Sequence, residues 1–81
     1  MTDIETQIQE YRDLLASKLH ELEVLEAEKQ EILTRLESAK YQDRTKIAAD
    51  MKNSEQKYRQ LAQEVKSISY EIKRLKDTIA N

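Results

Sequence analysis

The stretch Leu36–Tyr58, LESAKYQDRTKIAADMKNSEQKY, decides how this chain folds, because the hydrophobic repeat changes phase within it. On both sides of the stretch, apolar residues recur at the a and d positions of a heptad, the pattern of helices that pack along one stripe. Continuing the first repeat puts the next a position at residue 43, whereas the second repeat needs it at residue 44. One residue is therefore extra. The chain either absorbs it within a continuous helix or turns there.

Two features of this stretch favour a continuous helix. Leu25, Leu36, Ile47 and Tyr58 follow one another at a constant spacing, and an eleven-residue repeat keeps one face of a nearly straight helix apolar. Residues 40–45 contain neither glycine nor asparagine, the residues that most often end a helix before a tight turn. We therefore expect an all-α fold: a single long continuous helix that forms a coiled coil, either an antiparallel dimer or a higher helical bundle. The alternative is a two-helix antiparallel hairpin that turns near residues 40–45.

The composition limits what else the chain can build. Its 81 residues include no glycine, proline or cysteine, and 37% of them are charged. A chain this short and polar cannot bury a globular core alone, so its apolar stripe needs a partner helix. We expect one coiled-coil segment over residues 1–81, with an acidic half, residues 1–40, and a basic half, residues 41–81. The net charge of −2 gives no general attraction to nucleic acid or to an anionic membrane.

The apolar positions define the predicted helix–helix interface. Most lie at a or d, and Leu19 and Leu33 widen the first stripe at the flanking e position. Helix is expected to begin near residue 3, because Thr2–Glu5 has the form of a capping box. The predicted interface residues are Ile4, Ile8, Tyr11, Leu15, Leu19, Leu22, Leu25, Ile32, Leu33, Leu36, Ile47, Met51, Tyr58, Leu61, Val65, Ile68, Ile72, Leu75 and Ile79.

An antiparallel partner matches the two repeats with nearly full overlap, so that each a residue meets a d residue. The same layers form whether the partner is a second chain or the other half of the same chain. The charges beside the seam also favour antiparallel pairing, because Arg35 comes near Asp50. The approach of Glu21 to Glu64 opposes it. The predicted layers are Ile4 with Ile79, Ile8 with Leu75, Tyr11 with Ile72, Leu15 with Ile68, Leu22 with Leu61, Leu25 with Tyr58, Ile32 with Met51, and Leu36 with Ile47.

Two polar residues at core positions, Lys29 and Ser54, oppose each other in this arrangement. A polar layer weakens an apolar seam, but it also disfavours every register in which the polar residues would face apolar ones. We therefore predict that Lys29 and Ser54 form a layer that sets the register.

No pattern in the sequence predicts a catalytic, cofactor-binding or metal site. His20 and Glu23 lie one helical turn apart, but two ligands on an exposed helix do not close a metal site. We expect a non-enzymatic structural or interaction protein, a coiled-coil module that oligomerises or that spaces and joins partners. A homodimer is favoured. The alternative is a helical adaptor that pairs with a different protein as a subunit of a larger complex. We expect no small-molecule substrate, nucleic acid or membrane span, and an intracellular, cytoplasmic location.

Overall fold

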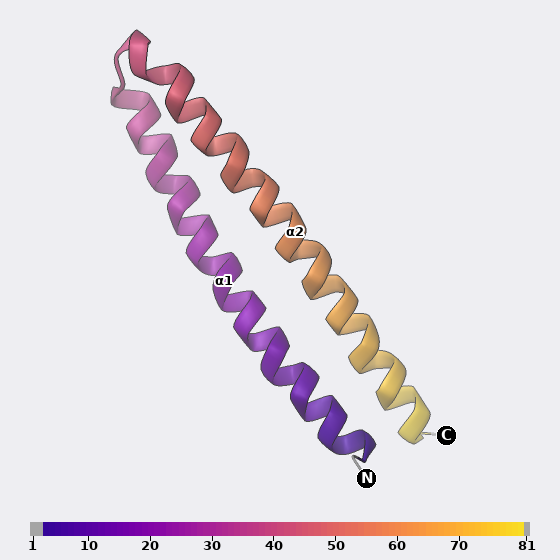
Figure 1. Ribbon diagram of the computed structural model, residues 1–81. Helices are drawn as coiled ribbons and strands as arrows, with labels where there is room; N and C mark the ends of the chain where they lie inside the picture. The colour runs from indigo at the N-terminus through magenta and orange to yellow at the C-terminus, as the bar shows by residue number, and fades with distance from the viewer. Residues whose placement is uncertain (1–2, 81) are drawn as a thin grey trace.

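The computed structural model describes residues 3–80, which form two long helices lying side by side (Figure 1). The first helix, α1, spans Ile4–Ser38, and the second, α2, spans Tyr41–Ala80. Both chain ends lie at the same end of the molecule, so the helices run antiparallel. The described chain measures 60 × 19 × 14 Å. The prediction of an all-α fold is confirmed.

The preferred prediction of one continuous helix is wrong, and the hairpin alternative is confirmed. The helices are joined by Ala39 and Lys40. Ala39 ends α1 in an extended conformation, with φ −77° and ψ 143°, and its amide donates to the Leu36 carbonyl at 3.4 Å. The Asp43 amide then donates to the Lys40 carbonyl at 2.9 Å, which starts α2. No residue in the described part of the chain has a positive φ. The turn therefore needs neither glycine nor asparagine, and their absence does not exclude it.

The start of α1 is fixed by a side-chain cap. Asp3 is the N-cap residue, and its Oδ1 accepts a hydrogen bond of 2.7 Å from the Thr6 amide. A carboxylate at this position satisfies an amide that has no partner within the helix and faces the positive end of the helix dipole. This hydrogen bond lowers the pKa of Asp3. The helix begins where the sequence predicts, but Thr2, the expected cap, lies outside the described residues.

The core is the seam between α1 and α2. A two-helix hairpin has only one face per helix to bury, so the apolar stripe of α1 packs along the stripe of α2. Full burial of one Leu or Ile side chain stabilises a fold by about 1.5–3 kcal/mol, and packing of this kind holds the long helices together. The buried hydrophobic residues are Ile8, Leu25, Ile32, Ile47, Ile68, Ile72 and Leu75.

Candidate protein interface along the hairpin

The open end of the hairpin contains the main cluster of buried residues. Ile8 of α1 packs there with three residues of α2, namely Ile68, Ile72 and Leu75. Ile4, Tyr11 and Leu15 are half-buried against this cluster. The cluster unites both members of three predicted antiparallel layers: Ile8 with Leu75, Tyr11 with Ile72, and Leu15 with Ile68. The antiparallel register derived from the two repeats therefore fits the packing at this end.

Three residues of the predicted helix–helix interface stay exposed in the hairpin: Leu19, Leu33 and Ile79. Leu19 and Leu33 are the residues that the sequence places beside the seam rather than in it. Ile79 lies in the last turn described for α2, at the open end. The other predicted interface residues are buried or half-buried.

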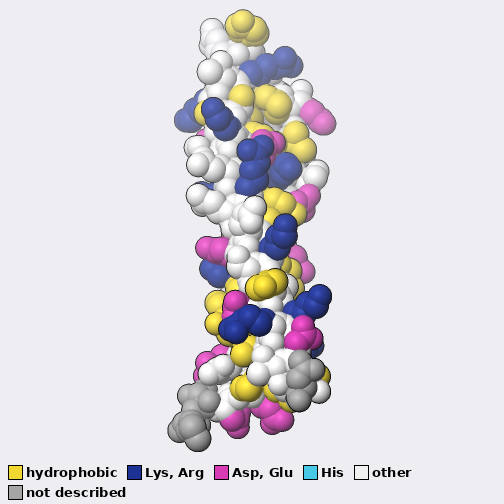
Figure 2. All heavy atoms as spheres, turned by 90° about the vertical axis from the view of Figure 1, so that its right-hand side faces the viewer, with side chains coloured by type: hydrophobic (Ala, Val, Ile, Leu, Met, Phe, Trp, Pro, Cys, Tyr) yellow, Lys and Arg dark blue, Asp and Glu magenta, His cyan; other side chains and the backbone are white. Residues whose placement is uncertain are grey.

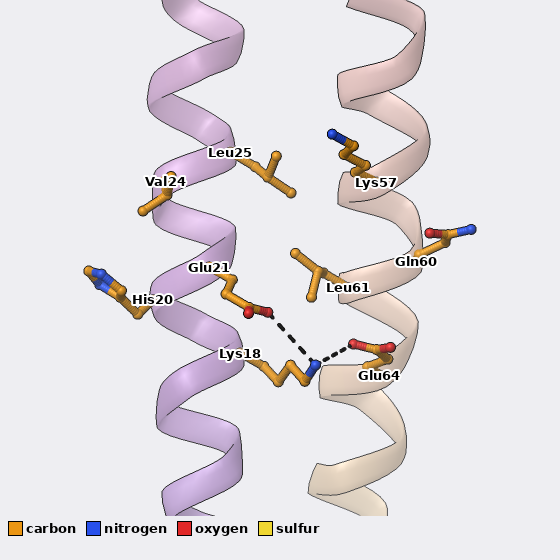
Figure 3. Close-up of a pocket in the computed structure, with 9 residues that line it drawn as sticks. All are labelled: Lys18, His20, Glu21, Val24, Leu25, Lys57, Gln60, Leu61 and Glu64. Carbon is orange, nitrogen blue, oxygen red and sulfur yellow. Dashed lines mark ion pairs between the residues drawn. The ribbon is translucent and has the colours of Figure 1, made fainter.

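A charged cluster bridges the two helices near their middle. The Lys18 Nζ lies 3.1 Å from a Glu64 carboxylate oxygen on α2 and 3.8 Å from one of Glu21 on α1 (Figure 3). The hydrogen bond to Glu64, and then the charge of that carboxylate, raise the pKa of Lys18. The lysine thus lies between two acidic side chains that would otherwise repel each other. The predicted register brings Glu21 near Glu64, but the sequence alone does not show that Lys18 relieves their repulsion. The signal was a lysine at a core position, three residues before one glutamate and facing the other.

A second ion pair joins the helices closer to the turn. The Arg35 Nη2 lies 3.7 Å from the Asp50 Oδ2, and both side chains are well exposed. The antiparallel register predicted this approach. Exposed pairs of this kind contribute at most about 1 kcal/mol, so the pair favours the register without holding the hairpin together.

The two residues of the predicted polar layer, Lys29 and Ser54, differ in burial. Ser54 is buried, with 6% of its surface exposed, and its Oγ has no hydrogen-bond partner among the described residues. Lys29 is half-buried, and its Nζ lies 5.8 Å from the centroid of the Tyr58 ring. A lysine over an aromatic ring at this distance makes a weak cation–π contact. Both residues lie in the seam, as expected, and their role in setting the register stays a prediction.

The flanks of α1 carry the large apolar side chains of that helix that the seam leaves exposed. Leu14, Leu19, Val24 and Leu33 each expose between 38% and 46% of their surface. On the face drawn in Figure 2, hydrophobic side chains reach the surface between charged ones, and Lys and Arg gather in the half nearer the turn. The flank residues are candidates for a contact with another protein.

A shallow groove follows one side of the seam. Leu14 and Val24 line it on α1, and the pair of Lys18 with Glu64 crosses it. The part beside Val24 has a volume of about 430 Å³, and Leu25 and Leu61 point toward each other across it (Figure 3). The groove is open along its length, so it offers a strip for side chains of another helix rather than an enclosed ligand site.

His20 and Glu23, which the sequence does not predict to bind a metal, make only a surface contact. His20 Nδ1 lies 3.9 Å from Glu23 Oε2, and both side chains are mostly exposed. Within residues 3–80, no three His, Asp or Glu side chains are grouped so that they could hold a metal ion.

Neither of the described helices contains a stretch that is long and apolar enough to cross a membrane. Compared with known protein families, curated proteins and solved structures, the chain matches none of them.

Proposed function

We propose that this chain is a non-enzymatic interaction module, a coiled-coil hairpin that joins or spaces other proteins along its helices. The observation that carries the proposal is that α1 leaves four apolar residues exposed, Leu14 and Val24 on one side of the seam and Leu19 and Leu33 on the other. The seam with α2 is already filled, and these side chains remain available beside it. Large apolar side chains left on a helix flank are a common feature of surfaces that bind other helices.

The size of the exposed patch sets a requirement on the partner. Burying a whole Leu or Val gains about 1.5–3 kcal/mol, so completing the burial of the two half-exposed side chains on one flank gains about 1–2.5 kcal/mol. Association of two proteins costs about 4–15 kcal/mol of lost freedom. A partner must therefore cover more than the two apolar residues of one flank. A helix lying along α1, which is about 50 Å long, would do so and would also meet its many charged residues.

Two kinds of partner fit this proposal. The first is a second copy of the chain, whose acidic and basic halves complement each other. The second is a helix of a different protein, in which case the chain is an adaptor within a larger complex. The exposed leucines favour this second form because the hairpin leaves them uncovered. In either form we propose that the chain acts in the cytoplasm.

The test is a paired substitution on the flank. Replacing both Leu19 and Leu33 by Ser removes apolar surface without touching the buried seam. The matched control replaces Tyr41 and Tyr70, which are also exposed but lie on α2. Sedimentation of the purified chains at micromolar concentration should show self-association that the leucine pair abolishes and the tyrosine pair leaves intact.

A parent chain that stays monomeric up to millimolar concentration would remove self-association from the proposal. The adaptor form would then require that the immobilised chain retain a partner protein and that the two leucine substitutions abolish that retention. Equal retention by the parent and by the leucine variant would refute the module altogether.

A further inference from the structure

We propose that two copies of this chain exchange helices. Each copy opens at Ala39 and Lys40, continues as one helix through that link, and pairs its α1 with the α2 of the other copy. The partner is thus a second copy of the same chain, joined through the seam. The proposed function uses the flank of α1, so the exchange goes beyond it and is tested separately.

The link of Ala39 and Lys40 can adopt a helical conformation. It consists of only two residues, and alanine and lysine are both good helix formers. Ala39 leaves the helical region through one torsion alone: its φ of −77° is already close to the helical value, and its ψ of 143° must rotate to about −42°. No residue of the link holds a left-handed conformation that would fix the turn. Opening therefore breaks two backbone hydrogen bonds of the turn and replaces them with helical ones.

The seam survives the exchange unchanged. Every contact between α1 and α2 joins residues that each copy possesses, so each contact can form between copies as well as within one. This holds for the packing of Ile8 against Leu75 and for the ion pair of Lys18 with Glu64. Exchange of identical elements is a low-cost route to a dimer for this reason, and short links between the exchanged elements favour it.

The phase of the apolar residues also fits the opened chain. Leu25 and Ile47 are buried in the hairpin seam, and Leu36 and Tyr58 are half-buried there. Their eleven-residue spacing places all four on one face of a nearly straight helix that runs through the link. The same four residues can therefore pack in the hairpin and in a continuous helix. For this reason the sequence has the pattern of one uninterrupted helix although the chain folds back.

Concentration decides which form is populated. A short link holds α2 beside α1 at an effective concentration of the order of millimolar. The hairpin therefore predominates over the exchanged form at micromolar concentration, and the exchanged dimer competes as the chain approaches about 1 mM. Any change that penalises the turn shifts the balance toward the dimer, and any change that penalises helix through the link shifts it toward the monomer.

Deleting Lys40 disfavours the turn and also favours a continuous helix. It leaves a single residue between the helices, and it removes the extra residue, so that the two heptad repeats join in phase. We expect this variant to be a dimer at micromolar concentration, with twice the mass of the parent and a length of about 115 Å by small-angle scattering.

Lys40→Pro is the matched control. Proline requires an extended conformation of the preceding residue, and Ala39 already has one. A helix through residue 40 would lose an amide and clash with the preceding turn. This variant should not exchange helices at about 1 mM, where the parent begins to do so.

Energy transfer between copies detects the exchange directly. Chains carrying a donor on Glu10→Cys are mixed with chains carrying an acceptor on Arg74→Cys, then unfolded and refolded together at about 1 mM total chain. We expect transfer between copies for the parent and for the Lys40 deletion, and none for Lys40→Pro. The Leu19→Ser, Leu33→Ser chain should also exchange, since its seam is intact.

Absence of transfer in the parent, or a Lys40 deletion that is monomeric, unfolded, or dimeric without transfer, would overturn the proposal. Loss of exchange in the leucine variant would mean that the flank and not the seam joins the copies, and would overturn it too.

Discussion

Truncating the packed pair Ile8 and Leu75 tests how α1 meets α2. Ile8 is 7% exposed and Leu75 is 6% exposed, and both belong to the cluster at the open end. Replacement by alanine removes three carbon groups from each, and each buried group contributes about 0.8 kcal/mol. Each single substitution should therefore lower the free energy of unfolding by about 2 kcal/mol. A hairpin has few layers around the site to leave a closed cavity, so the low end of the range for such truncations applies.

The double substitution should cost less than the two singles together. Once Ile8 is shortened, Leu75 has lost part of its contact, so its own truncation removes less. We expect the double variant to lose about 3–3.5 kcal/mol, which corresponds to a coupling of about 0.5–1 kcal/mol. Urea unfolding followed by circular dichroism measures all four chains. A constant concentration of a stabilising osmolyte keeps the weakest variant folded at the start of the titration.

Ile47 supplies the control. It is 5% exposed but lies near the turn, far along the hairpin from Ile8. The pair Ile8→Ala with Ile47→Ala should therefore be additive within about 0.3–0.5 kcal/mol. Additivity of Ile8 with Leu75, or a coupling of Ile8 with Ile47 as large as that with Leu75, would refute the antiparallel packing.

Three further changes probe single contacts. Lys18→Met removes a group whose pKa is raised by Glu64; the contribution of that pair is complete below the ordinary lysine range and is lost as pH rises through the raised value. Thermal melts from about pH 8 to about pH 12 should therefore show an alkaline decline in the parent that is weaker in Lys18→Met. Asp3→Asn keeps the cap but does not titrate. Because the pKa of Asp3 is lowered, its contribution is present at neutral pH and lost as pH falls through the lowered value. The protection of the first-turn amides, measured as their exchange relative to the unfolded chain at the same pH, should therefore fall with acid in the parent alone. Ser54→Ala removes a buried hydroxyl without a partner, and urea unfolding should show a gain of about 1 kcal/mol; a loss would mean that the hydroxyl is bonded in solution.

The seam could be predicted from the sequence because it depends on periodicity. The heptad stripes place Ile8 and Ile72 on facing stripes whatever the chain does at its middle, and the near match of the two repeats fixes the antiparallel register. The pair of Arg35 with Asp50 followed from that register. These features are determined by side chains spread over many turns, so no single residue decides them.

The turn could not be predicted because it depends on one backbone torsion, the ψ of Ala39, rather than on a residue type. Ala39 and Lys40 are good helix formers, and neither residue type predicts the end of a helix. The hairpin gains a partner helix within the same chain, and this packing outweighs the local preference for helix at Ala39. Lys18 was missed for a related reason: its role depends on Glu64, which is distant in sequence and near only after the chain turns.

The distance between labels at positions 10 and 74 of a single chain tests the hairpin most directly. Single-molecule energy transfer at nanomolar concentration excludes contributions from a second copy. Packed helix axes lie about 8–10 Å apart, so the hairpin predicts labels within about 25 Å of each other and nearly complete transfer. A continuous helix would separate the same positions by about 96 Å. Transfer near zero from chains that circular dichroism shows to be helical would contradict the hairpin.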